Sequence, residues 1–137
     1  MAQPLLVTAA IAMQEDDVLL TLRGREPYAL EWALPSGVGA WRFTSDPLEA
    51  IVGEVEGDVG CLFKGPKFFT ALYSDRHGPT LTLFYEGILE GIPIPLCRNV
   101  MDARYFPLEK AVKMSLAFDH NHALELYYQY RQAQKGR

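Results

Sequence analysis

The chain has 137 residues, of which 49% are hydrophobic and 22% are charged, and its formal net charge is −4. This length suits one domain spanning residues 1–137 with a core of its own, and the acidic balance excludes the basic footprint of a nucleic-acid-binding protein. The apolar stretches are too short for a membrane span, and the apolar start lacks the basic leader and cleavage site of a signal peptide.

Cysteine usage indicates the compartment. The two cysteines, Cys61 and Cys97, stand in neither a CxxC motif nor a metal-ligand spacing. Such isolated thiols suit a reducing environment. We therefore expect a cytoplasmic protein with neither a membrane nor a nucleic-acid partner.

The chain begins with a pattern typical of a β-hairpin. Residues 5–13 and 18–23 are rich in aliphatic residues and are separated by a short acidic turn. A glycine and a proline then end the strand pattern and leave Arg23 and Arg25 beside the break. A guanidinium group matches phosphate oxygens, so both arginines are candidate substrate ligands, although charge at a strand end most often just faces solvent.

Three aromatic residues surround the next loop. Tyr28, Trp32 and Trp41 flank a short strand that ends at Leu34. An aromatic ring near a phosphate site can stack on a base, so Tyr28 and Trp41 are candidate substrate-binding residues, with a place in the core as the alternative. For Trp32 we expect the core.

Residues 46–59 carry the signals of an amphipathic helix. Asp46 can cap its N-terminus, Pro47 suits the first helical position, Glu49 is placed for a capping box, and Gly60 can end the helix. At about 100° per residue the aliphatic side chains share one face that should pack on the core. They are Leu48, Ile51, Val52, Val55 and Val59.

The second half of the chain predicts strands followed by helices. A second hairpin is expected over residues 68–75 and 80–89. Glu86, the acid inside its second strand, could approach the site, although we expect it to face solvent. Two prolines make residues 91–95 a loop. The remaining expected elements are a strand at 103–107, a short helix at 108–114, and a last helix at 116–133 that Ser115 can cap. The core-facing residues of this last helix should be Ala123, Leu126, Tyr127 and Tyr130.

Glu54 and Asp58 are the residues that best indicate chemistry. They lie four apart on the helix over 46–59, at the edge of its apolar face and beside a glycine-bearing loop. Two carboxylates fixed one turn apart suit Mg²⁺, which takes oxygen ligands and is usually shared with substrate phosphates. Glu56 lies about 160° around the helix from Glu54 and should stay outside the site.

The stretch from 32 to 62 resembles the Nudix box, whose pattern is G-x5-E-x7-R-E-U-x-E-E-x-G-U, where U is an aliphatic residue. The likeness lies in the approach REPY and WALPSG within residues 25–37, and in the helical end EVEGDVGC at 54–61. The loop between them is two residues longer than in the pattern. Four other positions depart from it: Ser45 or Phe43 stands for the first Glu, Gly53 for Arg, Gly57 for the first paired Glu, and Asp58 for the second.

The resemblance implies the Nudix fold, an α/β/α sandwich with a mixed β-sheet between the acidic helix and the C-terminal helix. It also implies Mg²⁺ or Mn²⁺ held by Glu54 and Asp58, with Glu54 as the catalytic residue, acting as a metal ligand or a base. Two acids alone should bind the metal weakly. The family often carries another acidic ligand shortly before the strand at 103–107, but Asn99 or Val100 occupies that place here, and Asp102 is the nearest acid.

Two functions therefore stay open. The first is a MutT-like Nudix hydrolase of a nucleoside-diphosphate derivative such as an ADP-ribose-like compound, weakened by the incomplete box. The alternative is a non-catalytic Nudix-fold protein that binds a nucleotide-like ligand or a protein partner. The family resemblance favours the enzyme by a narrow margin, whereas the missing Glu and Arg favour the binder.

Two further features bear on this choice. The phrase LAFDH at 116–120 is similar to one in Nudix branches that act on ADP-ribose-like compounds and in their regulator relatives, although it equally fits a helix start with a solvated histidine. Ala50, Gly53 and Gly57 should form a smooth outward patch that permits close approach by a loop, ligand or second subunit. A homodimer is left open.

Overall fold

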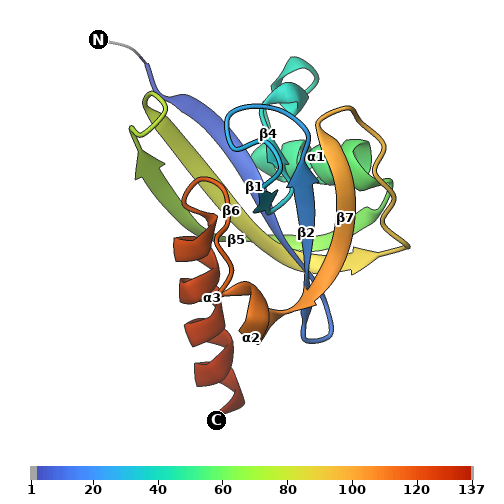
Figure 1. The fold of residues 1–137 in the computed structure, drawn as a ribbon, viewed down its shortest axis with the longest axis vertical. Helices are drawn as coiled ribbons and strands as arrows, with labels where there is room; N and C mark the ends of the chain where they lie inside the picture. Colours follow the sequence, from blue (N-terminus) through green and yellow to red (C-terminus); the bar gives the residue numbers. More distant parts are fainter. Residues whose placement is uncertain (1–2, 137) are drawn as a thin grey trace.

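The computed structural model describes residues 3–136 and contains one curved sheet with helices against it (Figure 1). The strands are β1 (Leu5–Gln14), β2 (Asp17–Arg23), β3 (Trp32–Ala33), β4 (Ser36–Gly37), β5 (Leu62–Ser74), β6 (Thr80–Glu90) and β7 (Val100–Pro107). The helices are α1 (Pro47–Val59), α2 (Leu108–Ala111) and α3 (His120–Lys135), with a 3-10 turn at Gly39–Arg42. Within the described part of the chain, no helix combines the length and apolar character needed to cross a membrane.

The sheet is mixed, as the sequence predicted. Its main path runs β3-β2-β1-β6-β5, with β4 paired to β1 and β7 paired to β2. The β1–β6 pair is parallel, and the other pairs are antiparallel. The two expected hairpins, β1–β2 and β5–β6, are both present. Because β6 lies beside β1, the central strand of the sheet comes from the start of the chain.

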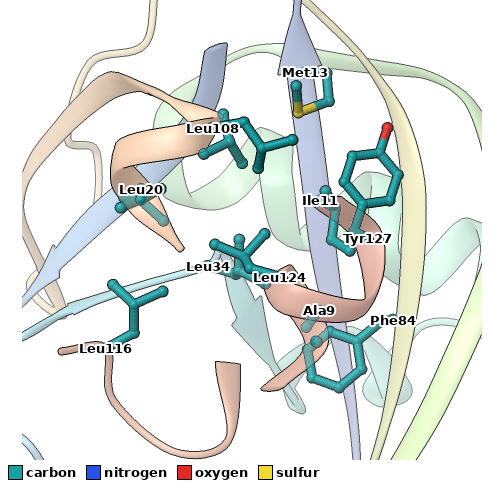
Figure 2. Close-up of a cluster of buried hydrophobic side chains, with 13 residues drawn as sticks. Ala9, Ile11, Met13, Leu20, Leu34, Phe84, Leu108, Leu116, Leu124 and Tyr127 are labelled. Carbon is teal, nitrogen blue, oxygen red and sulfur yellow. The ribbon is translucent and has the colours of Figure 1, made fainter. Parts of the chain in front are cut away.

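Each face of the sheet carries its own core, because successive side chains of β1 point to opposite faces. Ala9, Ile11 and Met13 pack with residues of α2 and α3, and Figure 2 shows Tyr127 beside Ile11 and Leu124 in the middle of the drawn side chains. The alternate residues Ala10 and Ala12 pack instead with the aliphatic face of α1. The α/β/α sandwich predicted from the sequence is therefore confirmed.

Helix α1 begins and ends where its local signals predict. The Asp46 carboxylate accepts a hydrogen bond from the Leu48 amide at 3.0 Å, and Gly60 ends the helix with a left-handed φ of 70°. The expected capping box is absent, since the Asp46 amide donates to the Thr44 hydroxyl at 3.0 Å rather than to Glu49. Because the Thr44 hydroxyl already accepts from that amide, no free N–H donor is left there for the Glu49 carboxylate.

The buried face of α1 differs from the prediction at its first turn. Leu48 is 42% exposed, whereas Ala50 is buried at 1%. Leu48 therefore lies outside the buried face, and Ala50 belongs to it. Ala50 does not belong to an outward smooth patch with Gly53 and Gly57, which was our expectation.

The last helix also starts later than predicted. Residues 116–119 are not helical, and the N-cap is Asp119 rather than Ser115. Phe118 has a positive φ of 56°, which a helix cannot contain. The buried residues of α3 are His120, Ala123, Leu124 and Tyr127, so Leu126 and Tyr130 were wrongly placed at the centre of its core face.

Candidate functional site

Glu54 and Asp58 line one cavity of about 380 Å³ between α1, β4 and the start of β7. Both side chains are half-buried, and each comes from the edge of α1 rather than from its apolar centre. The structure thus brings the two predicted carboxylates to one cavity. Glu56 is exposed and does not line this cavity.

The loop after β4 fixes the Glu54 side chain. The Ala40 amide donates a hydrogen bond to Glu54 Oε1 at 3.0 Å. A Cβ atom at Gly37 would lie 2.4 Å from Glu54 Oε2, so only glycine lets the β4 backbone approach the carboxylate this closely. The glycine of the sequence motif is therefore required by the acid of the helix.

Asp58 is the more perturbed of the two acids. Burial, and to a lesser extent the negative charge of Glu54, raise its pKa from 3.8 to about 7, although the hydrogen bond from the Cys97 thiol partly opposes both effects. The Cys97 Sγ–H donates to Asp58 Oδ1 at 3.7 Å. Near neutral pH, Asp58 therefore carries only part of a negative charge, because burial and then the charge of Glu54 disfavour its ionised form.

This pair fits a divalent cation only as a shared ligand. Within residues 3–136, no group of three His, Cys, Asp or Glu side chains is arranged to hold a metal ion. The Asp102 carboxylate accepts hydrogen bonds from the Ala103 amide and the Arg104 guanidinium. The charged groups that act on Glu86 are Lys67 and Arg131, not Glu54 or Asp58. The mutual repulsion of Glu54 and Asp58 suits a cation that takes its remaining ligands from phosphates and water.

A second cavity, of about 270 Å³, lies on the α3 side of the sheet and has aromatic walls. The Tyr28 ring meets the rings of His77 and Phe118 edge-on, with both centroids 4.9 Å away. The guanidinium carbon of Arg23 lies 4.7 Å from the centroid of Phe118. Cation–π and edge-to-face contacts of this kind fix the orientation of the rings.

Two of these aromatic residues have an unusual backbone. Tyr28 has a φ of 65° and Phe118 a φ of 56°, in the left-handed region that bulky residues avoid. Such a conformation costs roughly 1–3 kcal/mol at each residue and persists only where surrounding contacts impose it. Here it turns both rings toward one another at the cavity wall.

The two cavities adjoin across β4. Both are lined by Arg23, Arg25 and residues 36–38. The Arg23 Nε–H donates to the Pro27 carbonyl at 2.8 Å, and burial together with the charge of Arg25 lowers the pKa of Arg23. Two guanidinium groups therefore stand between an aromatic cavity and a carboxylate cavity, which suits an anionic group linked to a ring system.

Trp41 lies apart from this arrangement. Its indole Nε1–H donates to the Leu6 carbonyl at 3.0 Å, and it lines neither of the two cavities. Of the four residues predicted to contact substrate, the structure brings together Arg23, Arg25 and Tyr28. Trp32 is half-buried and packs against the core on the α3 side, as expected.

Solved structures with this architecture are known. The Nudix domain of NrtR from Shewanella oneidensis, crystallised with ADP ribose, superposes with a TM-score of 0.84 and 20% identity, over 95% of this chain and 90% of that domain. The MutT Nudix hydrolase from Burkholderia pseudomallei superposes with a TM-score of 0.76 and 22% identity, over 90% of this chain and 98% of that one. The chain has the Nudix fold.

The same comparison extends to a longer protein. NrtR crystallised with a 27mer DNA matches 95% of this chain with a TM-score of 0.74 and 20% identity, but the match covers only 63% of that chain. The absence of a nucleic-acid partner therefore stays a prediction. No protein-family model and no curated protein matches the sequence.

The Nudix fold places several residues at the aromatic cavity that the sequence did not assign to it. Phe118 and His120 come from the LAFDH phrase, and Arg76 and His77 come from the turn between β5 and β6. The interpretation of His120 as a solvated residue was wrong, because it is only 2% exposed. His77, in the turn between β5 and β6, packs against Tyr28. The LAFDH phrase at 116–120 was the sequence signal that pointed to Phe118 and His120.

Proposed function

We propose that this protein binds a nucleoside-diphosphate derivative of the ADP-ribose type across the two adjoining cavities. The base occupies the aromatic cavity beside Tyr28 and Phe118, and the diphosphate lies beside Arg23 and Arg25. The observation that carries this proposal is the sharing of both arginines between an aromatic cavity and a carboxylate cavity. The fold likeness to a Nudix domain crystallised with ADP ribose supports the choice of ligand class.

Binding without efficient turnover is the form of this function that the site favours. Only two carboxylates, Glu54 and Asp58, line the carboxylate cavity, and Asp58 is partly protonated near neutral pH because its pKa is about 7. The box arginine and one box glutamate are replaced by Gly53 and Gly57, and both glycines are exposed with no side chain in their place. Losses of supporting residues around metal ligands typically reduce affinity or activity roughly 10–100-fold.

Metal-dependent hydrolysis is the second candidate, and the Glu54–Asp58 pair favours it. A divalent cation held by these two carboxylates would neutralise phosphate charge and lower the pKa of a water molecule. The contribution of the chain itself is to position Glu54 through the Ala40 amide and to hold the phosphates with the arginines. Glu54 would then be the catalytic residue.

Calorimetric titration with ADP-ribose tests the binding proposal. Wild type should bind, and Arg25→Gln should bind at least about tenfold more weakly, because a charge-assisted hydrogen bond contributes roughly 1.5–3 kcal/mol. Lys110→Gln, a matched loss of charge on the exposed surface of α2, should bind like wild type. Equal affinities for Arg25→Gln and Lys110→Gln would refute the placement of the diphosphate.

A turnover assay with Mg²⁺ and with Mn²⁺ separates the two candidates. The screen covers ADP-ribose, dinucleoside polyphosphates, nucleotide sugars and nucleoside triphosphates. Cleavage by wild type that Glu54→Gln abolishes would establish the hydrolase. Binding without cleavage in both proteins, together with a ligand-dependent rise in melting temperature, would establish the binder.

A further inference from the structure

His120 is a buried polar residue that the proposed function does not yet use. It is the first residue of α3, it is 2% exposed, and it lines the aromatic cavity. Its ring lies between two aromatic neighbours, with centroids 5.7 Å from Phe84 and 5.5 Å from Phe118. A histidine in such surroundings must satisfy both of its ring nitrogens.

One ring nitrogen of His120 is already committed. The backbone amide of Leu34, in the buried segment after β3, donates a hydrogen bond to Nδ1 at 3.0 Å. Because Nδ1 accepts, the proton of the neutral ring belongs to Nε2. Burial and the nearby charge of Arg23 lower the pKa of His120 from 6.5 to about 3, so the ring stays neutral at physiological pH.

We propose that His120 is a specificity-determining residue of the aromatic cavity, whose Nε2–H donates a hydrogen bond to an uncharged acceptor of the ligand's base. This proposal rests on the binding function proposed above. A neutral imidazole gives no net charge to attract phosphate, which Arg23 and Arg25 are better suited to hold. A purine offers ring nitrogens as uncharged acceptors, and its faces can stack on the neighbouring rings.

The fixed tautomer is what makes His120 selective. Since the Leu34 amide holds Nδ1, the ring cannot present an acceptor to the cavity without breaking a buried hydrogen bond. A ligand that lacks an acceptor at this place would leave the Nε2–H unpaired, which is the mechanism by which polar sites reject close analogues.

Two substitutions separate the two nitrogens. In His120→Asn the amide oxygen can replace Nδ1 and accept from Leu34, but no donor reaches the place of Nε2. In His120→Gln the amide nitrogen can replace Nε2, but the Leu34 amide is left without its acceptor. The control is His122→Asn, which changes an exposed histidine on the first turn of the same helix.

The experiment measures melting temperature and calorimetric affinity for two probes, ADP-ribose and inorganic diphosphate. His120→Asn should keep a near-wild-type melting temperature and bind ADP-ribose about 3–10-fold more weakly, with no change for inorganic diphosphate. His120→Gln should lower the melting temperature but retain more of the ADP-ribose affinity. His122→Asn should match wild type in every measurement.

The outcomes that overturn the inference are distinct. If wild type fails to bind ADP-ribose, the proposed function and this inference fall together. If wild type binds ADP-ribose and His120→Asn binds it equally well, His120 only supports Leu34, and the inference alone fails. If His120→Asn weakens ADP-ribose and inorganic diphosphate by the same factor, its effect is a general distortion of the cavity, which also refutes a contact with the base.

Discussion

The contact between Gly37 and Glu54 makes a quantitative prediction. A methyl group at Gly37 would lie 2.4 Å from Glu54 Oε2 and 2.7 Å from Cδ, so the carboxylate must move. The movement should break its hydrogen bond with the Ala40 amide, now 3.0 Å long. A hydrogen bond to a charged group contributes about 1.5–3 kcal/mol, and we expect Gly37→Ala to lower the free energy of unfolding by this amount. The fold should survive, because the displaced atoms end a flexible side chain.

Urea denaturation of a double-mutant cycle measures this coupling. In a Glu54→Ala background the three atoms nearest to the added methyl group are gone, so Gly37→Ala should cost nearly nothing there. Gly39→Ala is the matched control, because its added methyl group would stand 3.6 Å from Glu54 Oε1, an ordinary contact. If Gly37→Ala destabilises both backgrounds equally, the cost lies in the β4 backbone, and the interpretation of Gly37 as the glycine that admits Glu54 is wrong.

Three further predictions follow from the same region. Gly57→Ala should raise the free energy of unfolding by about 1 kcal/mol, because alanine favours a helix and, apart from the helix's own nearby backbone, nothing lies within 4 Å of the added methyl group. A lower stability in urea denaturation would mean that another group covers this face. Trp41→Phe should cost about 0.5–1.5 kcal/mol through loss of the bond to Leu6 and leave ADP-ribose affinity unchanged; a weakened affinity in calorimetry would return Trp41 to the site. Mn²⁺ titration without nucleotide should show only weak binding, and tight binding would reveal an additional ligand beyond Glu54 and Asp58.

The half of the site that lies on α1 could be predicted because its determinants are local. Asp46, Pro47 and Gly60 define the ends of the helix, and helical periodicity then places Glu54 and Asp58 together at its edge. The glycine before the helix was recognised from the motif. Its contact with the Glu54 carboxylate could not be predicted, because it depends on how β4 packs against α1, and no local sequence signal determines that packing.

The aromatic half of the site could not be predicted in the same way. Its walls come from the loop around Tyr28, the β5–β6 turn and the start of α3, and only the fold brings these segments together. Phe118 adopts a left-handed backbone conformation and faces Tyr28, so the helix that the sequence pattern began at 116 begins at His120 instead. Likewise, the strand expected over residues 68–75 begins earlier, at Leu62, and a register shift between Lys64 and Lys67 lets β5 run through Gly65 and Pro66.

Asp58 in the carboxylate cavity and His120 in the aromatic cavity change the free energy of unfolding in opposite directions as the pH changes. The pKa of Asp58 is raised from 3.8 to about 7, so the folded protein binds more protons than the unfolded chain between these values. Its contribution to stability is complete below about pH 4 and is lost as the pH rises to 7. The pKa of His120 is lowered from 6.5 to about 3, so its contribution is complete above about pH 6.5 and is lost as the pH falls toward 3.

In wild type the two effects should largely cancel between about pH 4 and 6.5, because each amounts to at most roughly 4–5 kcal/mol and they have opposite signs. Urea denaturation in metal-free buffer should therefore show that Asp58→Asn becomes more stable as the pH rises through this range, whereas His120→Asn becomes less stable. Above pH 7, Asp58→Asn should be more stable than wild type, because it no longer holds a buried charge beside Glu54. Parallel pH profiles for the two variants would contradict this account. The buried charge of Asp58 beside Glu54 thus lowers the stability of the folded protein, and a cation between the two carboxylates would remove this loss. Such a loss is expected where residues are kept for binding a ligand rather than for their contribution to the fold.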